Sequence, residues 1–185
     1  MTRIIAGTLG GRRISVPPKG TRPTTDRVRE ALFSRLDHAG VLRGAHVLDL
    51  YAGSGAFGLE ALSRAAAHAT FVESGAAAMR VIQGNIRELG VGTRANTVRE
   101  RVQHYLERGT IPEPFDVVFL DPPYEISPGD MTAALAAVVP RLADQATVVV
   151  EWSTHAPSPQ WPRGLESTAS KDYGETVLHY AKHVG

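Results

Sequence analysis

The feature that most constrains the fold is a glycine-rich loop set between a strand-like run and a helix-like run. Residues 46–50 form a short apolar stretch, and Gly53, Gly55 and Gly58 follow in the spacing G-x-G-x-x-G. Glycines let the backbone turn sharply and approach a ligand closely. Glu73 lies 18 residues after Gly55, at the end of the next predicted strand, where a carboxylate can bind ribose hydroxyls. This order of elements predicts a nucleoside-cofactor site.

The remainder of the chain alternates between strand and helix patterns, which predicts an α/β fold with a mostly parallel sheet covered on both faces. Two short N-terminal strands around a glycine-rich turn predict a β-hairpin. The last two strands are expected to close the sheet as an antiparallel hairpin. The predicted strands cover residues 3–6, 12–16, 46–50, 70–73, 96–98, 115–120, 146–151, 165–171 and 176–182, and the predicted helices cover 24–38, 57–66, 75–89, 102–108 and 130–142. We expect two units, a basic hairpin extension over 1–20 and a Rossmann-like domain over 21–185.

Length and composition exclude several classes of protein. A chain of 185 residues suits one compact domain with a small extension, and 43% hydrophobic residues suffice for a core. The absence of cysteine excludes disulfides, thiol nucleophiles and thiolate metal sites. No apolar run reaches the roughly 18 residues that a membrane helix needs, and no signal-peptide pattern opens the chain. We therefore expect a cytoplasmic protein with no membrane partner.

A few other residues are expected to have structural roles. His179 and His183 have the spacing of a helical metal pair, but the surrounding sequence reads as a strand, which would separate them by about 13 Å. No metal site is therefore expected. Trp152 follows a predicted strand end and is expected to pack rather than to stack on a base. Asn85 is expected to cap or pack the second helix of the α/β region.

The charge of the chain is unevenly distributed. Residues 1–45 hold nine basic and three acidic residues, a net charge of +6, whereas the whole chain carries only +1. Such asymmetry indicates a polyanionic partner that is met by one end of the molecule. Arginine dominates over lysine, and its planar guanidinium suits phosphate groups. Arg3, Arg12, Arg13 and Lys19 are the candidate contacts to nucleic acid.

The residues around the glycine loop indicate which nucleoside cofactor is bound. A dinucleotide fold sets its pyrophosphate at the helix N-terminus, where a neighbouring carboxylate would repel it. Here Asp49 stands four residues before Gly53. S-adenosylmethionine carries an ammonium and a sulfonium group, which a carboxylate attracts. The arrangement D-x-x-x-G-x-G therefore favours S-adenosylmethionine over a nicotinamide dinucleotide.

A second motif, Asp121-Pro122-Pro123-Tyr124, follows the apolar strand over 117–120. In doubly wound sheets ligands bind beyond the carboxyl ends of the strands, so Asp121 should face the same crevice as the glycine loop. Two prolines remove two N–H donors and leave the Asp121 carboxylate and the Pro122 carbonyl as acceptors. This pair can hold both hydrogens of a nucleobase amine and orient its lone pair for methyl transfer. Tyr124 offers a ring on which a splayed-out base can stack.

Taken together, these motifs resemble the RsmD family of S-adenosylmethionine-dependent methyltransferases. The resemblance is carried by stretches over nearly the whole chain, namely residues 3–7, 11–14, 21–33, 49–55, 121–124 and 173–176. It implies a Rossmann-like methyltransferase fold and methylation of N2 of one guanine in 16S ribosomal RNA. It also implies S-adenosylmethionine as cofactor and an assembling small ribosomal subunit as the partner.

The resemblance implies roles for individual residues. The matching cofactor residues are Asp49, Ala52, Gly53, Ser54, Gly55 and Glu73, and the matching catalytic residues are Asp121, Pro122, Pro123 and Tyr124. Arg22, Thr24 and Asp26 fall in the segment that closes over the methionine end of the cofactor in related enzymes. The sequence departs from the pattern at Arg101, where many such enzymes carry an acid for the adenine amine, so no residue is assigned to that role.

Other functions remain open at this point. A DNA adenine-N6 methyltransferase would share the D-P-P-Y motif, although 185 residues leave little room for a target-recognition region. An NAD(P)-dependent oxidoreductase would share the G-x-G-x-x-G loop. A ribosome-assembly factor without catalytic activity would bind RNA and transfer no methyl group.

Overall fold

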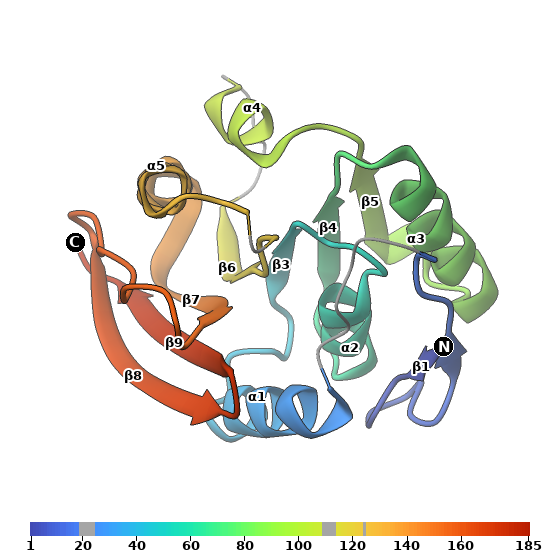
Figure 1. Cartoon of the computed structure of the whole chain (residues 1–185). Helices are drawn as coiled ribbons and strands as arrows, with labels where there is room; N and C mark the ends of the chain where they lie inside the picture. The colour runs from blue at the N-terminus through green and yellow to red at the C-terminus, as the bar shows by residue number, and fades with distance from the viewer. Residues whose placement is uncertain (19–24, 109–113, 124) are drawn as a thin grey trace.

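The computed structural model describes residues 1–18, 25–108, 114–123 and 125–185. Its centre is a seven-stranded sheet in the order β5-β4-β3-β6-β7-β9-β8 (Figure 1). The first five of these strands run parallel, and β9 and β8 are antiparallel to their neighbours. The strands are β3 (His46–Leu50), β4 (His68–Val72), β5 (Ala95–Val98), β6 (Phe115–Leu120), β7 (Leu142–Ser153), β8 (Leu165–Tyr173) and β9 (Thr176–His183). The Rossmann-like fold predicted from the sequence is confirmed.

Helices cover the two faces of the sheet in separate groups. The helices are α1 (Asp26–His38), α2 (Ala56–Ser63), α3 (Ala76–Leu89), α4 (Val102–Glu107) and α5 (Pro128–Val138), with a short 3-10 turn at Gly92–Arg94. Residues of α1, α2 and α3 pack with Val47, Phe119 and Val149, while residues of α4 and α5 pack with Leu48 and Val118. Neighbouring residues of one strand thus enter opposite cores, as the alternation of a strand requires.

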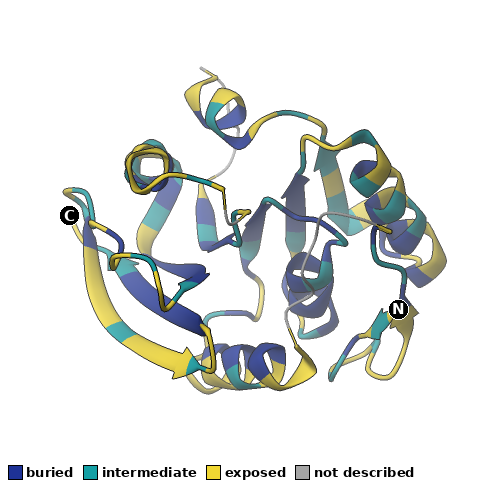
Figure 2. Ribbon diagram, in the orientation of Figure 1, coloured by how far each residue is buried: buried dark blue, intermediate teal, exposed yellow. Residues whose placement is uncertain are grey.

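Burial follows this layering (Figure 2). The central strands β3, β4 and β6 are almost entirely buried, whereas the edge strand β8 is largely exposed. The sequence of β8, LESTASKDY, is polar, as befits an edge strand with one free side. No helix in the described part of the chain is both long and apolar enough to cross a membrane.

The N-terminal hairpin is shorter than the sequence predicts. Only β1 (Thr2–Arg3) and β2 (Arg13–Ile14) pair, in antiparallel register. Ile4 still exchanges backbone hydrogen bonds with Arg12 and Gly11, but the next two amides, of Ile5 and Ala6, donate to the carboxylate of Glu60 at 2.8 and 3.1 Å. Glu60 lies in α2 and is fully buried. The predicted boundary after residue 20 falls outside the described residues, so the division into two units stays a prediction.

A second difference concerns the helix predicted over 130–142. The observed α5 begins after Ser127, whose hydroxyl accepts the Asp130 amide at 3.0 Å, and has Pro128 in its first turn. It ends at Val138 and passes into a 3-10 turn, Val139–Arg141. Pro140 has no N–H to donate, so the helix cannot continue through it. The chain then enters β7 four residues earlier than predicted, with a register irregularity opposite Phe115–Val117.

Candidate functional site

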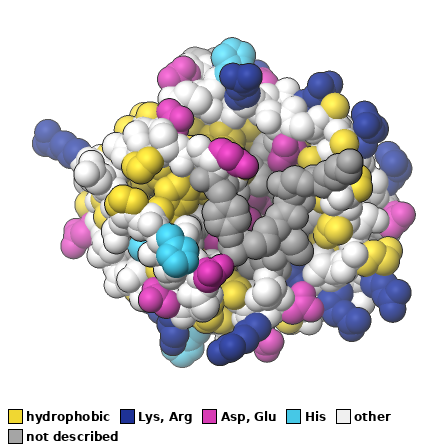
Figure 3. Space-filling view, viewed as in Figure 1, with side chains coloured by type: hydrophobic (Ala, Val, Ile, Leu, Met, Phe, Trp, Pro, Cys, Tyr) yellow, Lys and Arg dark blue, Asp and Glu magenta, His cyan; other side chains and the backbone are white. Residues whose placement is uncertain are grey.

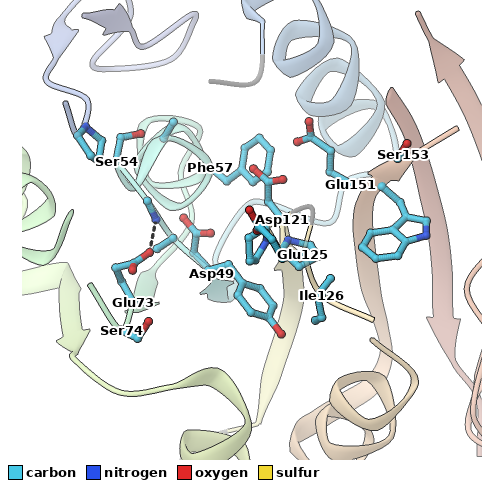
Figure 4. A pocket seen from close by; sticks show the side chains of 18 of the residues that line it. Asp49, Ser54, Phe57, Glu73, Ser74, Asp121, Glu125, Ile126, Glu151 and Ser153 are labelled. Atoms are coloured by element: carbon cyan, nitrogen blue, oxygen red, sulfur yellow. Dashed lines mark hydrogen bonds between the residues drawn. The ribbon is translucent and has the colours of Figure 1, made fainter. Parts of the chain in front are cut away.

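A cavity of about 570 Å³ opens where the carboxyl ends of β4, β3, β6 and β7 meet (Figure 4). Its walls come from four strand ends, the loop before α2, the start of the chain and α1. Because parallel strands place their carboxyl ends on one edge, residues far apart in the sequence are brought together here. The predicted residues that line it are Asp49, Ala52, Gly53, Ser54, Glu73, Asp121, Pro122 and Pro123.

The glycine loop has a backbone that suits close approach to a ligand. Gly53 has φ of 59°, and Gly55, with φ of 83°, stands immediately before α2. These left-handed conformations favour glycine. Gly58 has a different role, since a Cβ there would lie 2.3 Å from the ring of Phe71. That glycine lets α2 pack closely on β4, so the loop lies against the sheet edge.

Two backbone amides hold the carboxylate of Glu73 in place. One of its oxygens accepts the Gly53 amide at 2.9 Å, and the other accepts the Gly75 amide at 2.7 Å (Figure 4). Each carboxylate oxygen has a further lone pair for a ligand hydroxyl. The interaction also fixes the glycine loop relative to the end of β4, so Glu73 and the loop form one unit.

Asp49 lies deeper, beneath the loop, and is 1% exposed. Its Oδ2 accepts the Gly58 amide at 3.0 Å. Burial raises the pKa of Asp49 to about 8; the hydrogen bond from Gly58 opposes this shift, and the charge of Glu73 adds to it. A nearby cation would favour the ionised form and reverse that trend. The carboxyl group is therefore placed to respond to the charge of whatever occupies the cavity.

The predicted catalytic motif lies at the end of β6. Asp121, Pro122 and Pro123 all line the cavity, with Asp121 half-buried and directed into it (Figure 4). Tyr124 lies outside the described residues. The far wall comes from β7 and the segment that follows it, including Trp152. The indole of Trp152 donates to the Pro157 carbonyl at 3.0 Å and is 8% exposed, which agrees with the expected packing role.

Two predicted cofactor residues in the described part of the chain do not line this cavity, namely Gly55, which stands immediately before α2, and Asp26. The carboxylate of Asp26 accepts the Thr2 hydroxyl at 3.1 Å and the Arg29 guanidinium at 2.9 Å. It borders a smaller pocket of about 260 Å³ beside Arg3 and Arg13. Asp26 therefore lies with the N-terminal hairpin in this structure. Arg22, Thr24 and Lys19 fall outside the described residues.

The basic residues of the hairpin lie on the surface. Arg3 and Arg13 are cross-strand partners, and both are exposed. Arg12 is also exposed, and its guanidinium donates to the Glu88 carbonyl near the end of α3 at 2.8 Å. Figure 3 shows Lys and Arg side chains along the side of the molecule where the hairpin and α3 lie, with acidic side chains both at the edges and near the middle of the face.

Three charged residues of the cavity were missed by the sequence reasoning, namely Arg29, Glu125 and Glu151. Arg29 is 1% exposed and donates to the Arg3 carbonyl at 2.6 Å, and burial lowers its pKa. Arg29 has helical spacing to Leu32, Phe33 and Leu36 and so lies on the apolar face of α1. This spacing could have predicted that Arg29 is buried. Glu151 is 5% exposed and lies within β7, directly after the apolar run over 148–150.

Asn85 proves to be more than a packing residue. Its side chain is buried and donates to the Ser15 carbonyl at 2.9 Å and the Ser54 carbonyl at 3.0 Å, while its oxygen accepts the Ser15 amide. It thereby links the end of the hairpin to the glycine loop. Within the described ranges, no group of three or more His, Asp or Glu side chains could hold a metal ion.

The chain is similar to known proteins over nearly its whole length. The family model "Conserved hypothetical protein 95" matches residues 2–182. Ribosomal RNA small subunit methyltransferase D of Escherichia coli K12 is 42% identical over 177 residues, covering 95% of this chain and 86% of that protein. The protein of the same name from Haemophilus influenzae is 34% identical over 157 residues, covering 84% and 80%.

Solved structures of other proteins resemble this one. The Escherichia coli protein yhhF superposes with a TM-score of 0.86 at 37% identity, covering 98% of this chain and 97% of that one. Magnesium protoporphyrin IX methyltransferase from Synechocystis, solved with bound S-adenosylmethionine, has a TM-score of 0.68 at 10% identity over 89% of this chain and 87% of that chain, which shows a shared fold alone. From the family match and the level of identity, the chain belongs to the RsmD family of methyltransferases.

Proposed function

We propose that this protein transfers a methyl group from S-adenosylmethionine to the exocyclic N2 of one guanine in 16S ribosomal RNA. Its proposed substrate is the RNA of an assembling small subunit in the cytoplasm. The observation that carries the proposal is a shared cavity: the Asp121-Pro122 acceptors and the Glu73-glycine loop open into the same space. The names of the relatives, which are small-subunit ribosomal RNA methyltransferases, support the choice of RNA.

The cavity fits a cationic nucleoside cofactor. Its volume of about 570 Å³ is within the usual range for small-molecule sites. Among the described lining residues, five are carboxylic acids and one, Arg29, is basic. Such a lining disfavours a pyrophosphate and attracts a sulfonium and an ammonium group. When bound, S-adenosylmethionine supplies an electrophilic methyl group on a positively charged sulfur.

We assign cofactor-binding roles by position. Glu73 would accept the ribose hydroxyls, the backbone of Gly53 and Ser54 would lie against the cofactor, and Asp49 would face its positive end. For the methionine end, Arg22 and Thr24 remain proposals that rest on the sequence resemblance.

At the substrate end, Asp121 and the Pro122 carbonyl would accept the two hydrogens of the guanine amine. Holding both hydrogens orients the nitrogen and frees its lone pair from the ring, so alignment and electrostatics supply most of the rate. As the nitrogen gains the methyl group it loses one proton, either to the Asp121 carboxylate or to water. Tyr124 is proposed to stack on the extruded base. Arg3, Arg12, Arg13 and Lys19 are proposed to contact RNA phosphates.

The test is mass-spectrometric mapping of methylated guanines in small-subunit ribosomal RNA from cells with and without this gene. We expect one N2-methylguanosine to disappear and to return with the wild-type gene. The Asp121→Ala variant should lose at least about 100-fold of its turnover, because its amine acceptor is gone. Asp144→Ala, which removes an exposed acid at the other end of β7, should restore the modification. An unchanged methylation map would refute the ribosomal assignment.

A further inference from the structure

Glu151 occupies the same place on β7 that Asp121 occupies on β6. The two strands are parallel neighbours, and their last paired residues are Leu120 and Val150. Asp121 and Glu151 come next, on the face of the sheet that also carries Phe119 and Val149 two residues earlier. One strand spacing, about 4.8 Å, therefore separates their backbones. Figure 4 shows both side chains at the same cavity.

The strand order gives the cavity two ends. Glu73, Asp49, Asp121 and Glu151 follow one another along the sheet edge, at the ends of β4, β3, β6 and β7. Glu151 is thus on the side of Asp121 that faces away from the glycine loop. It lines the cavity together with Ile126, Trp152 and Pro157, which add apolar surface at this end. A planar base that presents its amine to Asp121 would lie in this part of the cavity.

Guanine and adenine differ in the hydrogen-bonding group that lies beside the exocyclic amine. The Asp121-Pro122 acceptors can hold any exocyclic amine, whether N2 of guanine or N6 of adenine. Guanine carries an N1–H donor beside N2, whereas adenine presents a lone pair at N1 beside N6. A carboxylate accepts hydrogen bonds, so it attracts the first edge and repels the second.

We propose that Glu151 determines base specificity by accepting the N1–H of the target guanine while Asp121 and Pro122 hold its N2. This inference rests on the proposed guanine-N2 activity and adds the residue that would separate guanine from adenine. Because Glu151 is 5% exposed, little water reaches its carboxylate to solvate the N1 lone pair of a base that lacks this hydrogen. Binding an edge without the N1 hydrogen then leaves two acceptors facing each other in a buried site, which is costly.

The experiment uses 2,6-diaminopurine, which keeps the amine at C2 but has a lone pair at N1. Small subunits are reconstituted with RNA that carries guanine or 2,6-diaminopurine at the mapped target position, and kcat/KM is measured for each. Wild type should prefer guanine by at least about 100-fold. In Glu151→Gln the amide oxygen can still accept N1–H, and the amide NH2 can donate to a lone pair. Its preference should therefore fall to within about tenfold.

Glu166→Gln is the matched control, because it makes the same chemical change on the exposed face of β8. It should keep the wild-type preference. If all three proteins methylate guanine with the same preference over 2,6-diaminopurine, the role of Glu151 is overturned while the proposed function stands. Equal rates on both bases by wild type alone would also overturn it, whatever the stability of the variant. No transfer to guanine by wild type would instead refute the proposed function itself.

Discussion

Replacing Asp49 with asparagine should change how stability depends on pH. Burial raises the pKa of Asp49 to about 8 in the folded protein, whereas an unfolded aspartate titrates near 4. The folded state therefore binds this proton more tightly than the unfolded state. Its contribution to stability is complete below about pH 4 and is lost as the pH rises through about 8. Asp49→Asn cannot ionise and still offers an oxygen to the Gly58 amide, so it should lack this dependence.

The expected magnitude follows from linkage. Between pH 6 and pH 9 the unfolded state, with a pKa near 4, is ionised at this group. The folded state, with a pKa of about 8, keeps the proton over roughly two of these pH units. At about 1.4 kcal/mol per unit, the free energy of unfolding of wild type should fall by about 3 kcal/mol relative to Asp49→Asn.

The assay is urea unfolding of ligand-free protein at several pH values across this interval, for wild type and variant. His68 and His179 also titrate, and burial lowers their pKa values, so their contribution to stability rises with pH. Both proteins share these groups, and the difference between the two curves isolates Asp49. Parallel curves would show that Asp49 titrates normally in the folded state and would refute the reasoning.

Two further predictions concern the hairpin. Gly7→Ala should lower the free energy of unfolding by about 2–4 kcal/mol, since Gly7 has φ of +86° and a Cβ would lie 2.0 Å from the Ser63 carbonyl oxygen. Gly11→Ala has nearly the same φ, +84°, with nothing within 4 Å, so it should cost only about 1–2 kcal/mol, and equal losses in chemical denaturation would refute the packing argument. Arg12→Ala combined with Arg13→Ala should reduce the slope of log affinity for RNA against log salt by about one unit for each lost phosphate contact. An unchanged slope in a titration at several salt concentrations would place both arginines away from the RNA.

Much of the fold could be predicted because the central strands are mostly apolar. The strands at 46–50 and 115–120 were predicted with the observed bounds. Errors arose where tertiary contacts decide the end of an element. The first hairpin strand is shortened by the buried acid Glu60, which lies 54 residues along the chain from the Ala6 amide that it accepts. No local pattern in the N-terminal segment contains that information.

The candidate site could be predicted only where its residues stand in recognisable motifs. Glu73 follows a strand 18 residues after Gly55, and Asp121 opens a proline motif at a strand end, so the parallel-sheet rule was enough to bring them together. Arg29 was missed because its burial depends on acceptors in the hairpin, including the Arg3 carbonyl. Glu151 stands beside no such signature, and its importance emerges only from the pairing of β7 with β6.

The buried carboxylate of Glu60 has a consequence for the modularity of the protein. Its partners are two backbone amides of the hairpin and the guanidinium of Arg64, at 2.9 Å. Deleting residues 1–15 would leave this acid of α2 without two of these three hydrogen bonds, a loss that costs several kcal/mol. The basic hairpin therefore cannot be removed without a loss of stability in the rest of the chain. A minimal catalytic domain without it would need an apolar replacement at Glu60 before it could fold stably.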